Sequence, residues 1–503
     1  MTTTTATTDT TEAARRATAG VAVVVLAAAA PALADRWVIE PQVSLAAIYS
    51  DNIHLLPPGA SPAPGDSKDD FVGQFAPSIA ISRDTERLDV TFSYLYQYLG
   101  YAEDSDSNES FNQADAHVEA ELVREHFFVD LDGGISQQLI DPDQAFTPSN
   151  IPLTSNRIDA VDATLAPYWT QSIGNVGDLE LRYERGIVRY EDAPPVTVAP
   201  GEAFPVQDLD RQQTIVTLVS PPERRGFTWG ADYEFDRQEF STASDVEFEE
   251  TSLQLGYWVT GSGRLFVVGG AESDYQEHRS EAELDEGFWE VGMQYSVAAR
   301  DDFEIRFGER VFGPSRYLRW QHTLTGSTLR LDYIDEASTN SEALFASRTQ
   351  PVDVESEAGL NRPETTDIFV RHRLQGTWTF DRGGRSVWDV AVYGERRDDR
   401  VRDPDDPTPV LGTEENFGTT ADWKWKAGGH TTLGFGLGWE RSDLTGDDDF
   451  DLWHASFEAT HDLGVHTALR LLVERASRDG AEFTDYDENR VSLFIDRKFF
   501  QPR

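Results

Sequence analysis

The connections between the periodic segments of this sequence alternate between short and long, and this alternation limits the possible folds more than any other feature. Every second connection is tight: 83–86, 123–126, 172–177, 221–226, 260–263, 299–302, 325–327, 381–385, 427–430 and 462–464. The intervening ones are mostly long, acidic and rich in Pro, Gly, Ser or Asn, with the short one near Phe312 as the exception. Short turns on one rim and long loops on the other are typical of an outer-membrane β-barrel, in which the short turns are periplasmic.

The segments themselves have two distinct faces. In RLDVTFSYLYQYLGY (87–101), one face is formed by Leu88, Val90, Phe92, Tyr94, Tyr96 and Tyr98, and the other begins Arg87, Asp89, Thr91, Ser93. A strand has a side-chain period of two, so this pattern predicts one apolar and one largely polar surface. The segment also exceeds the about five or six residues of a common globular strand and fits the roughly nine to eleven that a tilted strand needs in lipid. We therefore expect the apolar face to meet lipid and the polar face to line a lumen.

The same alternation recurs at 113–122, where Ala114, Ala116, Val118, Ala120 and Leu122 oppose polar or charged residues, and again at 432–440 and 453–460. Counting such segments predicts an all-β, transmembrane, antiparallel up-and-down barrel of about 22 strands, within a range of about 16–22. A soluble sandwich fits less well, and a β-solenoid would need a fixed repeat, which the sequence lacks. Aromatic residues at segment ends, among them Trp37, Tyr49, Tyr98, Tyr101, Trp169, Tyr190, Trp439 and Phe499, predict interfacial girdles.

The N-terminus predicts export. Residues 1–34 have a polar start with Arg15 and Arg16, an apolar run from Val21 and Ala32-Leu33-Ala34 before Asp35, which is the pattern of a cleaved signal peptide. We assign residues 35–503 to the barrel and expect the outer membrane of a Gram-negative cell. No later run of about 18 apolar residues predicts a membrane-spanning helix.

Composition agrees with this interpretation and excludes several functions. The formal net charge of −46 disfavours a nucleic-acid partner. The absence of cysteine excludes thiol catalysis, a thiolate zinc site and a disulfide framework. A hydrophobic content of 39% and a mean hydropathy of −0.47 suit a barrel, because lipid-facing and lumen-facing residues average out.

The lumen face is expected to carry charges of both signs. The candidate lumen-lining residues are Glu119, Glu121, Asp130, Asp132, Arg306, Arg310, Lys424 and Lys426. Most should form cross-strand ion pairs in a wet interior, and the functional alternative is a charged wall on a solute path. The first strand begins at about Trp37, which leaves no plug domain, and loop 335–363 is a candidate to fold inward as a constriction.

No motif predicts catalysis, a metal or a cofactor. His454, His461 and His466 lack metal-ligand spacing, and solvated rim positions are the better interpretation. The acidic groups around Asp104 and Asp447 lack the glycine and the terminal glutamate of an EF-hand, so solvated loop charge is favoured over weak divalent binding. No G-x-S-x-G elbow is present, although a triad assembled across strands would leave no local motif.

The mature N-terminus resembles the outer-membrane proteins associated with the PEP-CTERM/exosortase system. The residues that carry the resemblance are Trp37, Pro41, Tyr49, Asp51, Asn52 and Leu55, followed by Asn156-Arg157 and Ala166-Pro167-Tyr168. The resemblance covers most of the chain and is weak after residue 200, and the chain ends FFQPR instead of on a terminal aromatic residue. It implies a barrel that aids polysaccharide export or organisation at the outer membrane, without catalytic residues.

Three functions follow as hypotheses. The first is a barrel linked to exopolysaccharide export, as a large channel or a scaffold, with outer-membrane lipid, the barrel-assembly machinery, polysaccharide and export-system components as partners. The second is a general cation-preferring porin, which rests on the acidic excess. The third, a barrel enzyme, has no motif behind it.

Overall fold

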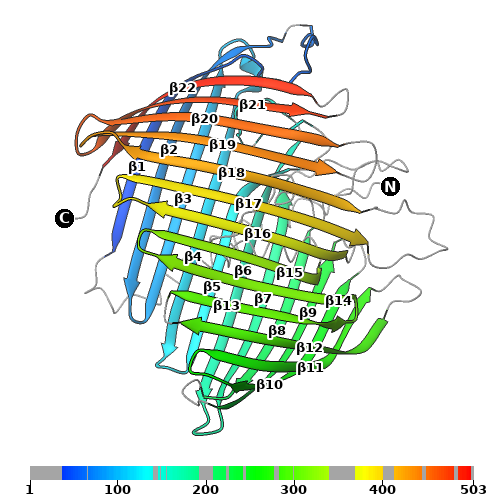
Figure 1. The fold of residues 1–503 in the computed structure, drawn as a ribbon. Helices are drawn as coiled ribbons and strands as arrows, with labels where there is room; N and C mark the ends of the chain where they lie inside the picture. Colours follow the sequence, from blue (N-terminus) through cyan, green and yellow to red (C-terminus); the bar gives the residue numbers. More distant parts are fainter. Residues whose placement is uncertain are drawn as a thin grey trace, which may run out of the picture.

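In a computed structural model the chain forms a closed antiparallel β-barrel of 22 strands, as the sequence predicts (Figure 1). The structure describes residues 37–499 apart from 65, 140–144, 148, 155, 192–207, 222–225, 242–244, 277–282, 298–299, 339–368, 400–412, 444–448 and 481–484. Each strand pairs with the next along the chain, and β1 pairs with β22 from Gln42–Lys498 to Ser50–Arg490, which closes the ring. The signal-peptide prediction for residues 1–34 lies outside the described residues.

The strands are 10 to 16 residues long, as expected for tilted membrane-crossing strands that extend past the lipid. They are β1 (Val38–Ser50), β2 (Asp70–Thr85), β3 (Leu88–Tyr101), β4 (Glu109–Val123), β5 (Phe127–Leu139), β6 (Arg157–Ser172), β7 (Asp178–Glu191), β8 (Leu209–Val219), β9 (Phe227–Phe240), β10 (Val246–Trp258), β11 (Gly263–Gln276), β12 (Glu283–Val297), β13 (Asp301–Arg310), β14 (Gly313–Leu324), β15 (Ser327–Ser338), β16 (Phe369–Asp381), β17 (Ser386–Asp399), β18 (Glu414–Lys426), β19 (Thr431–Asp443), β20 (Phe450–Asp462), β21 (Thr467–Asp479) and β22 (Tyr486–Lys498).

The predicted connections are confirmed on both rims. All ten tight turns join consecutive strands on one rim, beginning with β2–β3 and ending with β20–β21. The opposite rim carries the long connections together with the short β13–β14 turn at 311–312, which the sequence had marked as the exception. The described part of the long connections includes one short 3-10 helix, Ser105–Ser107. No helix among the described residues is long and apolar enough to cross a membrane.

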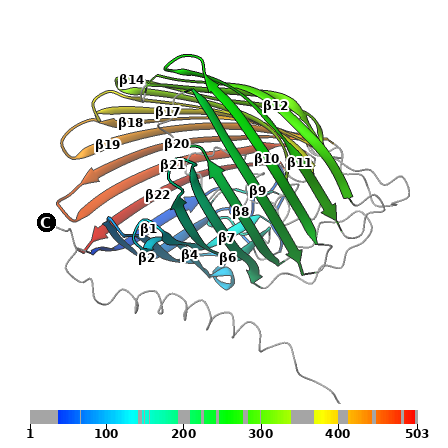
Figure 2. The ribbon, with the colours of Figure 1, turned by 90° about the horizontal axis from the view of Figure 1, so that it is seen from below.

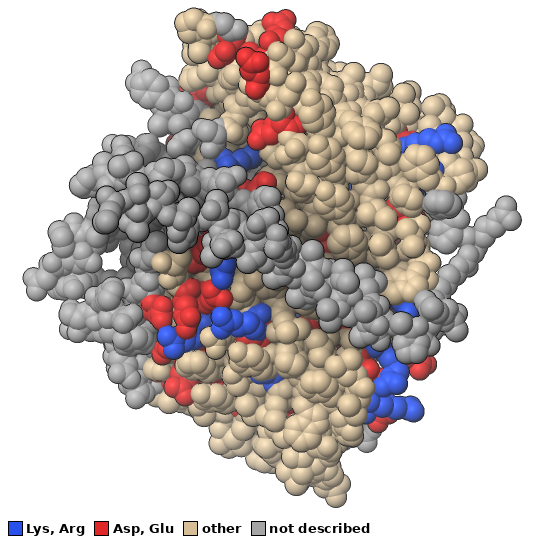
Figure 3. Space-filling model, turned by 180° about the vertical axis from the view of Figure 1, so that it is seen from behind, with Lys and Arg blue, Asp and Glu red and all other residues tan. Residues whose placement is uncertain are grey.

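The outer face of the sheet is apolar. Residues that are paired directly across strands share a face, and one face collects exposed large side chains such as Leu437, Phe71, Tyr257 and Trp453, which are 64%, 64%, 59% and 56% exposed. Broad areas of that surface carry no charged side chain (Figure 3). Exposed apolar area on this scale would be unfavourable in water and is the lipid-facing belt of a transmembrane barrel. On β3 the outward face is the predicted one, from Leu88 to Tyr98.

Aromatic rings form continuous rows on this belt. Across β17 to β20, Trp388 stacks on Trp423 with centroids 5.1 Å apart, Trp423 contacts Phe435 at 5.4 Å, and Phe435 contacts Phe457 at 4.9 Å. A second row, nearer the long-loop rim, runs through Phe417, Trp439 and Trp453. Rows of this kind are typical of interfacial girdles.

Two of the residues predicted for the girdles lie elsewhere. Tyr101 is 4% exposed, and its hydroxyl donates to the Ile151 carbonyl, so it faces the interior. Tyr190 also faces inward and packs against a cluster of Val188, Leu209, Phe240 and Val246. Both predictions were wrong because an aromatic residue at a strand end suits an apolar interior cluster as well as a lipid headgroup region.

The core of the molecule lies inside the barrel at its long-loop end. Two loop segments, 51–56 and 145–154 without the undescribed residue 148, fold into the ring and pack on the inner face. Leu55 and Phe146 form one cluster with residues of β20 to β22, and Ile53 and Ile151 form another with residues of β1 to β4. Because these clusters are enclosed by the sheet, they identify the face that bears them as the lumen side. Figure 2 shows the curved sheet from below relative to Figure 1.

Candidate functional site

The lumen wall of β3 to β5 is acidic. By strand register, its inward-facing charged residues are the carboxylates Asp89, Glu109, Asp115, Glu119, Glu121, Asp130 and Asp132, with His117 as the only basic side chain. Asp89, Glu119 and Asp130 are directly opposite one another on three neighbouring strands. Like charges placed in this way repel one another, so this surface keeps a negative potential that a solute in the lumen would meet.

Some of these carboxylates have partners within the described chain and others have none. Asp130 accepts a hydrogen bond from Arg182 Nη1 at 2.8 Å, and Asp132 lies 2.6 Å from His117 Nδ1. Glu121, next to the turn, binds Arg87 Nε at 2.9 Å. Asp89, Asp115 and Glu119 form no ion pair with any described residue, and we call these three the free acidic trio.

The opposite wall carries arginines. In a ring of 22 strands β14 to β16 lie eleven strands from β3 to β5, on the far side of the lumen (Figure 2). Their inward charges are four arginines and three carboxylates, namely Arg319, Arg330, Arg371 and Arg373 with Asp332, Glu336 and Asp381. Asp332 lies between two arginines, 3.2 Å from Arg319 Nε and 2.6 Å from Arg330 Nε. The lumen is therefore electrically asymmetric across its width.

The remaining candidate residues also face inward. Arg310 contacts Glu250 at 2.8 Å and lies 3.4 Å from Glu272 and 3.8 Å from Glu290, so one guanidinium joins three carboxylates from three strands. Arg306 pairs with Glu304, and its guanidinium lies over the Tyr317 ring at 4.8 Å. Lys424 and Lys426, at the short-turn end of β18, are exposed and form no ion pair within the described part of the chain.

The solvent exposure of the lumen wall changes along the barrel axis. On β3, the inward-facing Thr91 and Ser93 near the short turns are exposed, whereas Leu99 and Tyr101 near the long loops are buried under the inward-folded segments. The half of this wall nearest the short turns is therefore wet, and the other half is occupied by protein. We call the pair of segments 51–56 and 145–154 the lumen constriction.

Segment 51–56 is held by residues of the motif that carried the resemblance. Asp51 accepts hydrogen bonds from the backbone and side-chain nitrogens of Asn489 at 2.7 and 2.8 Å. The Asn52 amide is bonded to both the N–H and the carbonyl of Leu56, each at 2.9 Å. This bracket holds the intervening Leu55 at a φ of 50°, a left-handed conformation unfavourable for leucine, while its side chain is buried at 3% exposure.

Segment 145–154 is fastened by hydroxyl groups from the wall. Tyr101 donates to the Ile151 carbonyl at 2.8 Å, and Tyr486 donates to the Phe146 carbonyl at 2.6 Å. The two segments also bond to each other, with Leu153 N 2.7 Å from the Ile53 carbonyl. Because these bonds satisfy backbone groups buried inside the barrel, the constriction is a built part of the fold.

Polar side chains complete the attachment. Asn150 donates to Gln97 and Gln137 at 3.3 Å each and accepts from Arg157 Nη1 at 3.1 Å. Arg157 also donates to the Thr147 carbonyl. Arg157 belongs to the Asn-Arg element of the resemblance, so two of the three matched elements participate in building the constriction.

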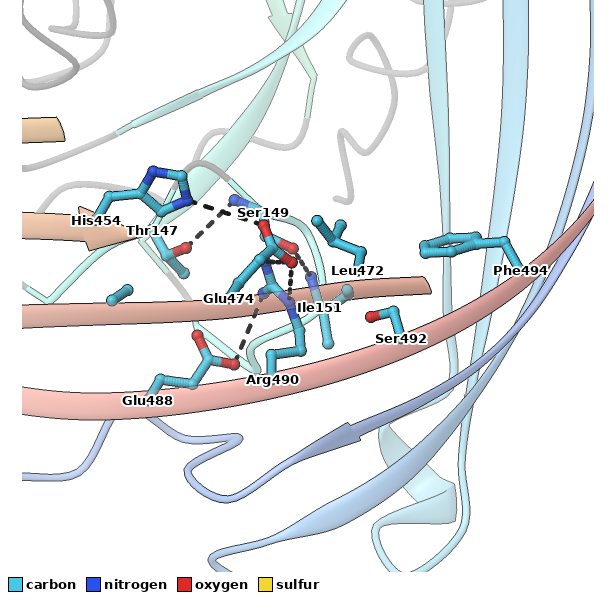
Figure 4. A pocket seen from close by; sticks show the side chains of 11 residues that line it. Thr147, Ser149, Ile151, His454, Leu472, Glu474, Glu488, Arg490, Ser492 and Phe494 are labelled. Carbon is cyan, nitrogen blue, oxygen red and sulfur yellow. Dashed lines mark hydrogen bonds and ion pairs between the residues drawn. The ribbon is translucent and has the colours of Figure 1, made fainter. Parts of the chain in front are cut away.

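A cavity of about 330 Å³ lies between this constriction and the inner face of β20 to β22 (Figure 4). Its lining comprises Thr147, Ser149, Ile151, His454, Leu472, Glu474, Ala476, Glu488, Arg490, Ser492 and Phe494. Arg490 donates to Glu474 from Nε at 2.9 Å and from Nη2 at 2.8 Å, and His454 lies 3.9 Å from Glu474. One end of the cavity is therefore charged and the other is apolar.

The histidines and acidic groups singled out in the sequence do not converge. His454 faces the lumen, His461 contacts Thr431 at 2.9 Å, and His466 lies in the β20–β21 turn. Asp104 pairs with His54, and Asn108 accepts from the Tyr101 backbone, so each serves its own loop contact. Within the described residues no group of three or more His, Asp or Glu side chains is arranged to hold a metal ion. Asp447 and Asp448 lie outside the described residues.

Sequence reasoning missed the constriction and the cavity. It placed the candidate constriction at 335–363; of this range, Asp335 to Ser338 belong to β15 and the rest lies outside the described residues. The signal for the actual constriction was present as buried apolar residues in otherwise polar loops, namely Ile53, Leu55, Phe146 and Ile151. Apolar residues in a long, otherwise polar loop indicate a segment that packs against another part of the protein.

Comparison with known proteins finds distant likenesses to solved structures. No family model matches the chain, and no curated protein matches it. Solved structures of a ferric enterobactin receptor from Pseudomonas aeruginosa, the siderophore receptor PirA from Acinetobacter baumannii and the FrpB iron transporter from Neisseria meningitidis are similar at 12%, 11% and 8% identity. Each comparison covers 92% of this chain and 80%, 80% and 82% of the other, with TM-scores of 0.47. Nothing about ligands carries over at this level.

Proposed function

We propose that this chain is an outer-membrane β-barrel that serves exopolysaccharide export, as a channel or a scaffold for the polymer. The observation that supports it best is the wet lumen wall near the short turns, where Thr91, Ser93 and Asp115 are exposed on the inward face. A wall of hydroxyls and charges suits a hydrated polymer, because passage requires contacts favourable enough for entry and weak enough for release.

The resemblance to barrels of the PEP-CTERM/exosortase system is the second support. Asp51, Asn52 and Arg157, which carry part of it, fasten the constriction at the long-loop end. In this proposal the partners are outer-membrane lipid, the barrel-assembly machinery, the polysaccharide and components of the export system, and nucleic acid is not among them. The long loops face the cell exterior and the short turns face the periplasm.

Deletion of the gene tests the proposal. Released and surface-bound polysaccharide should fall in the deletion strain and return when the wild-type gene is supplied. Secretion of an unrelated exported protein is the control for general damage to the envelope. Unchanged polysaccharide together with normal secretion would reject a role in export.

A cation-preferring porin is the second candidate, and the acidic wall of β3 to β5 favours it. Seven carboxylates face that side of the lumen without a Lys or Arg on the same three strands. Planar-bilayer recording separates the two functions, since a general porin passes ions continuously and with a cation preference. A reconstituted barrel without ion flux would exclude the porin and leave the export role open.

Variants of the lumen constriction provide a second test of whether solutes pass through the barrel. Replacing Tyr101 and Tyr486 with Phe removes two hydroxyls that hold segment 145–154, each contributing about 1 kcal/mol. Conductance of the double variant should exceed that of the wild type because the segment undocks more often. Tyr94→Phe is the matched control, since its hydroxyl bonds Asn112 at 2.7 Å on the outer face.

A further inference from the structure

The cavity between the constriction and β20 to β22 combines two kinds of surface. Leu472 and Phe494 form its apolar end, and Glu474, Glu488 and Arg490 form its charged end (Figure 4). All the strand residues of the lining have even numbers on β20, β21 and β22, so they lie on the lumen side by strand register. A ligand in the lumen would meet an aromatic ring beside a set of hydrogen-bonding groups.

Two buried polar atoms of this cavity have no hydrogen-bond partner in the described chain, namely Arg490 Nη1 and Ser492 Oγ. Ser492 is 1% exposed and Arg490 is 7% exposed. Buried polar groups are nearly always paired, and of the thirteen described side-chain atoms without a hydrogen-bond partner these two belong to residues that line the cavity, where a ligand can supply the missing bond. Ser492 Oγ can donate and accept, whereas Arg490 Nη1 can only donate.

We infer that this cavity binds one neutral sugar unit. A pyranose ring has an apolar C–H face that packs beside Phe494, whose ring also carries the Arg470 guanidinium 3.8 Å from its centroid, and it has hydroxyls that both donate and accept. Glu474 and Glu488 accept from such hydroxyls, Arg490 donates to them, and Ser492 does either. The volume of about 330 Å³ lies at the small end of ligand pockets, about 300–1,000 Å³, which suits a single unit better than a folded polymer.

The charges of the cavity argue for a neutral ligand. Two carboxylates face one arginine, and that arginine already donates two hydrogen bonds to Glu474. An anionic ligand would be repelled by the second carboxylate, Glu488. It would also find Arg490 already paired with the two glutamates. A cationic ligand would compete with Arg490, which lies between the two carboxylates (Figure 4). This inference deepens the proposed export function and rests on it only for the source of the sugar.

Binding to the purified full-length barrel in detergent tests the inference. The probes are methyl glucoside and methyl mannoside, with glucuronate and glucosamine as the charged counterparts, and the method is saturation-transfer NMR followed by calorimetry. At least one neutral glycoside should bind with a Kd of about 1–10 mM, as expected of a ligand this small. Tighter binding of glucuronate or glucosamine would overturn the inference, as would no binding of either glycoside.

Variants locate the site. Ser492→Ala should weaken glycoside binding about three- to tenfold, because one hydrogen bond is lost. Ser44→Ala is the matched control, since Ser44 Oγ is also buried and unpartnered on the lumen face but lies outside the cavity. Phe494→Leu keeps an apolar side chain and removes the ring, and it should also weaken binding.

Equal binding by wild type and Ser492→Ala would place the sugar elsewhere and reject the site. Heat-modifiable gel migration of each variant confirms that the barrel is folded. The binding assay is independent of the polysaccharide phenotype of the deletion strain. A barrel that binds the glycoside while deletion leaves polysaccharide unchanged would reject export alone, and the converse would reject the cavity alone.

Discussion

Two walls of the same lumen differ in how their charges are arranged. The wall of β3 to β5 presents seven carboxylates, of which Asp89, Asp115 and Glu119 have no ion-pair partner among the described residues. The wall of β14 to β16, eleven strands away, presents four arginines and three carboxylates. The wall of β3 to β5 therefore keeps carboxylates that no cation neutralises, whereas most charged side chains of the wall of β14 to β16 form ion pairs within the protein.

This contrast shows that the acidic excess of the chain is not confined to its outer loops. A field across the lumen follows from fixed charges of opposite excess on facing walls. Carboxylates that form no ion pair and are exposed can act on a passing solute, whereas buried pairs mainly fix the position of neighbouring strands. The walls should consequently respond in opposite ways to the same type of substitution.

Glu395→Gln gives the largest expected effect. Glu395 on β17 binds Arg371 of the arginine wall at 2.7 Å and also contacts Arg397, and the three side chains are 10%, 4% and 6% exposed. Removing its charge leaves two buried guanidinium groups without their shared carboxylate, which should cost about 3 kcal/mol of unfolding free energy. Urea unfolding in lipid vesicles, followed by tryptophan fluorescence, measures this loss.

Glu119→Gln is the same chemical change on the acidic wall and serves as the control. Glu119 is exposed, forms no ion pair with a described residue and faces two other carboxylates across the strands, so the variant should lose no stability and should gain at most about 1 kcal/mol of unfolding free energy. Similar losses in both variants would mean that the two walls do not differ in the way described.

Local patterns in the sequence were sufficient for the barrel. The period-two alternation at 87–101 and 113–122 sets the lipid and lumen faces within each strand, and turn chemistry sets the rims, including the exception at 311–312. The partners in each ion pair could not be predicted in the same way, because they depend on the register between strands, which local sequence patterns do not specify. Arg310, for example, meets Glu250 from a strand 60 residues earlier in the chain.

The packing partners of the constriction could not be derived from the sequence, for a related reason. Its segments pack on residues from both ends of the chain, as when Leu55 joins Phe146 and Phe450 in one cluster. A loop has no side-chain periodicity from which such contacts could be predicted. The same limitation applies to the cavity, whose lining combines Thr147 with Phe494.

We expect an effect of intermediate size on the ion selectivity of the barrel when charges on either wall are removed. If ions pass the lumen, the triple variant Asp89→Asn, Asp115→Asn and Glu119→Gln should shift the reversal potential toward that of a non-selective pore, because the free acidic trio attracts cations. Arg319→Gln with Arg330→Gln should shift it the other way, since Asp332 is then unpaired. Reversal potentials of reconstituted barrels under a salt gradient measure both, and shifts of the same sign would contradict the asymmetry.

The smallest expected effect is on stability at low salt. Asp89→Asn removes one of three like charges placed side by side, which should raise the unfolding free energy by about 0.2–1 kcal/mol. The gain should disappear in 1 M salt, where the Debye length falls to about 3 Å. A gain that persists in high salt would arise from something other than repulsion between the carboxylates.

The assignment of the two faces of each strand underlies the whole account, and thiol labelling tests it most directly. The chain has no cysteine, so single-cysteine variants react without background. In lipid vesicles, a charged thiol reagent should label Glu119→Cys and Asp115→Cys on β4, which face a wet lumen, and should leave Val118→Cys and Ala116→Cys unmodified in lipid. Labelling of the even-numbered positions instead would place the apolar face in water and contradict the barrel lumen described for this protein.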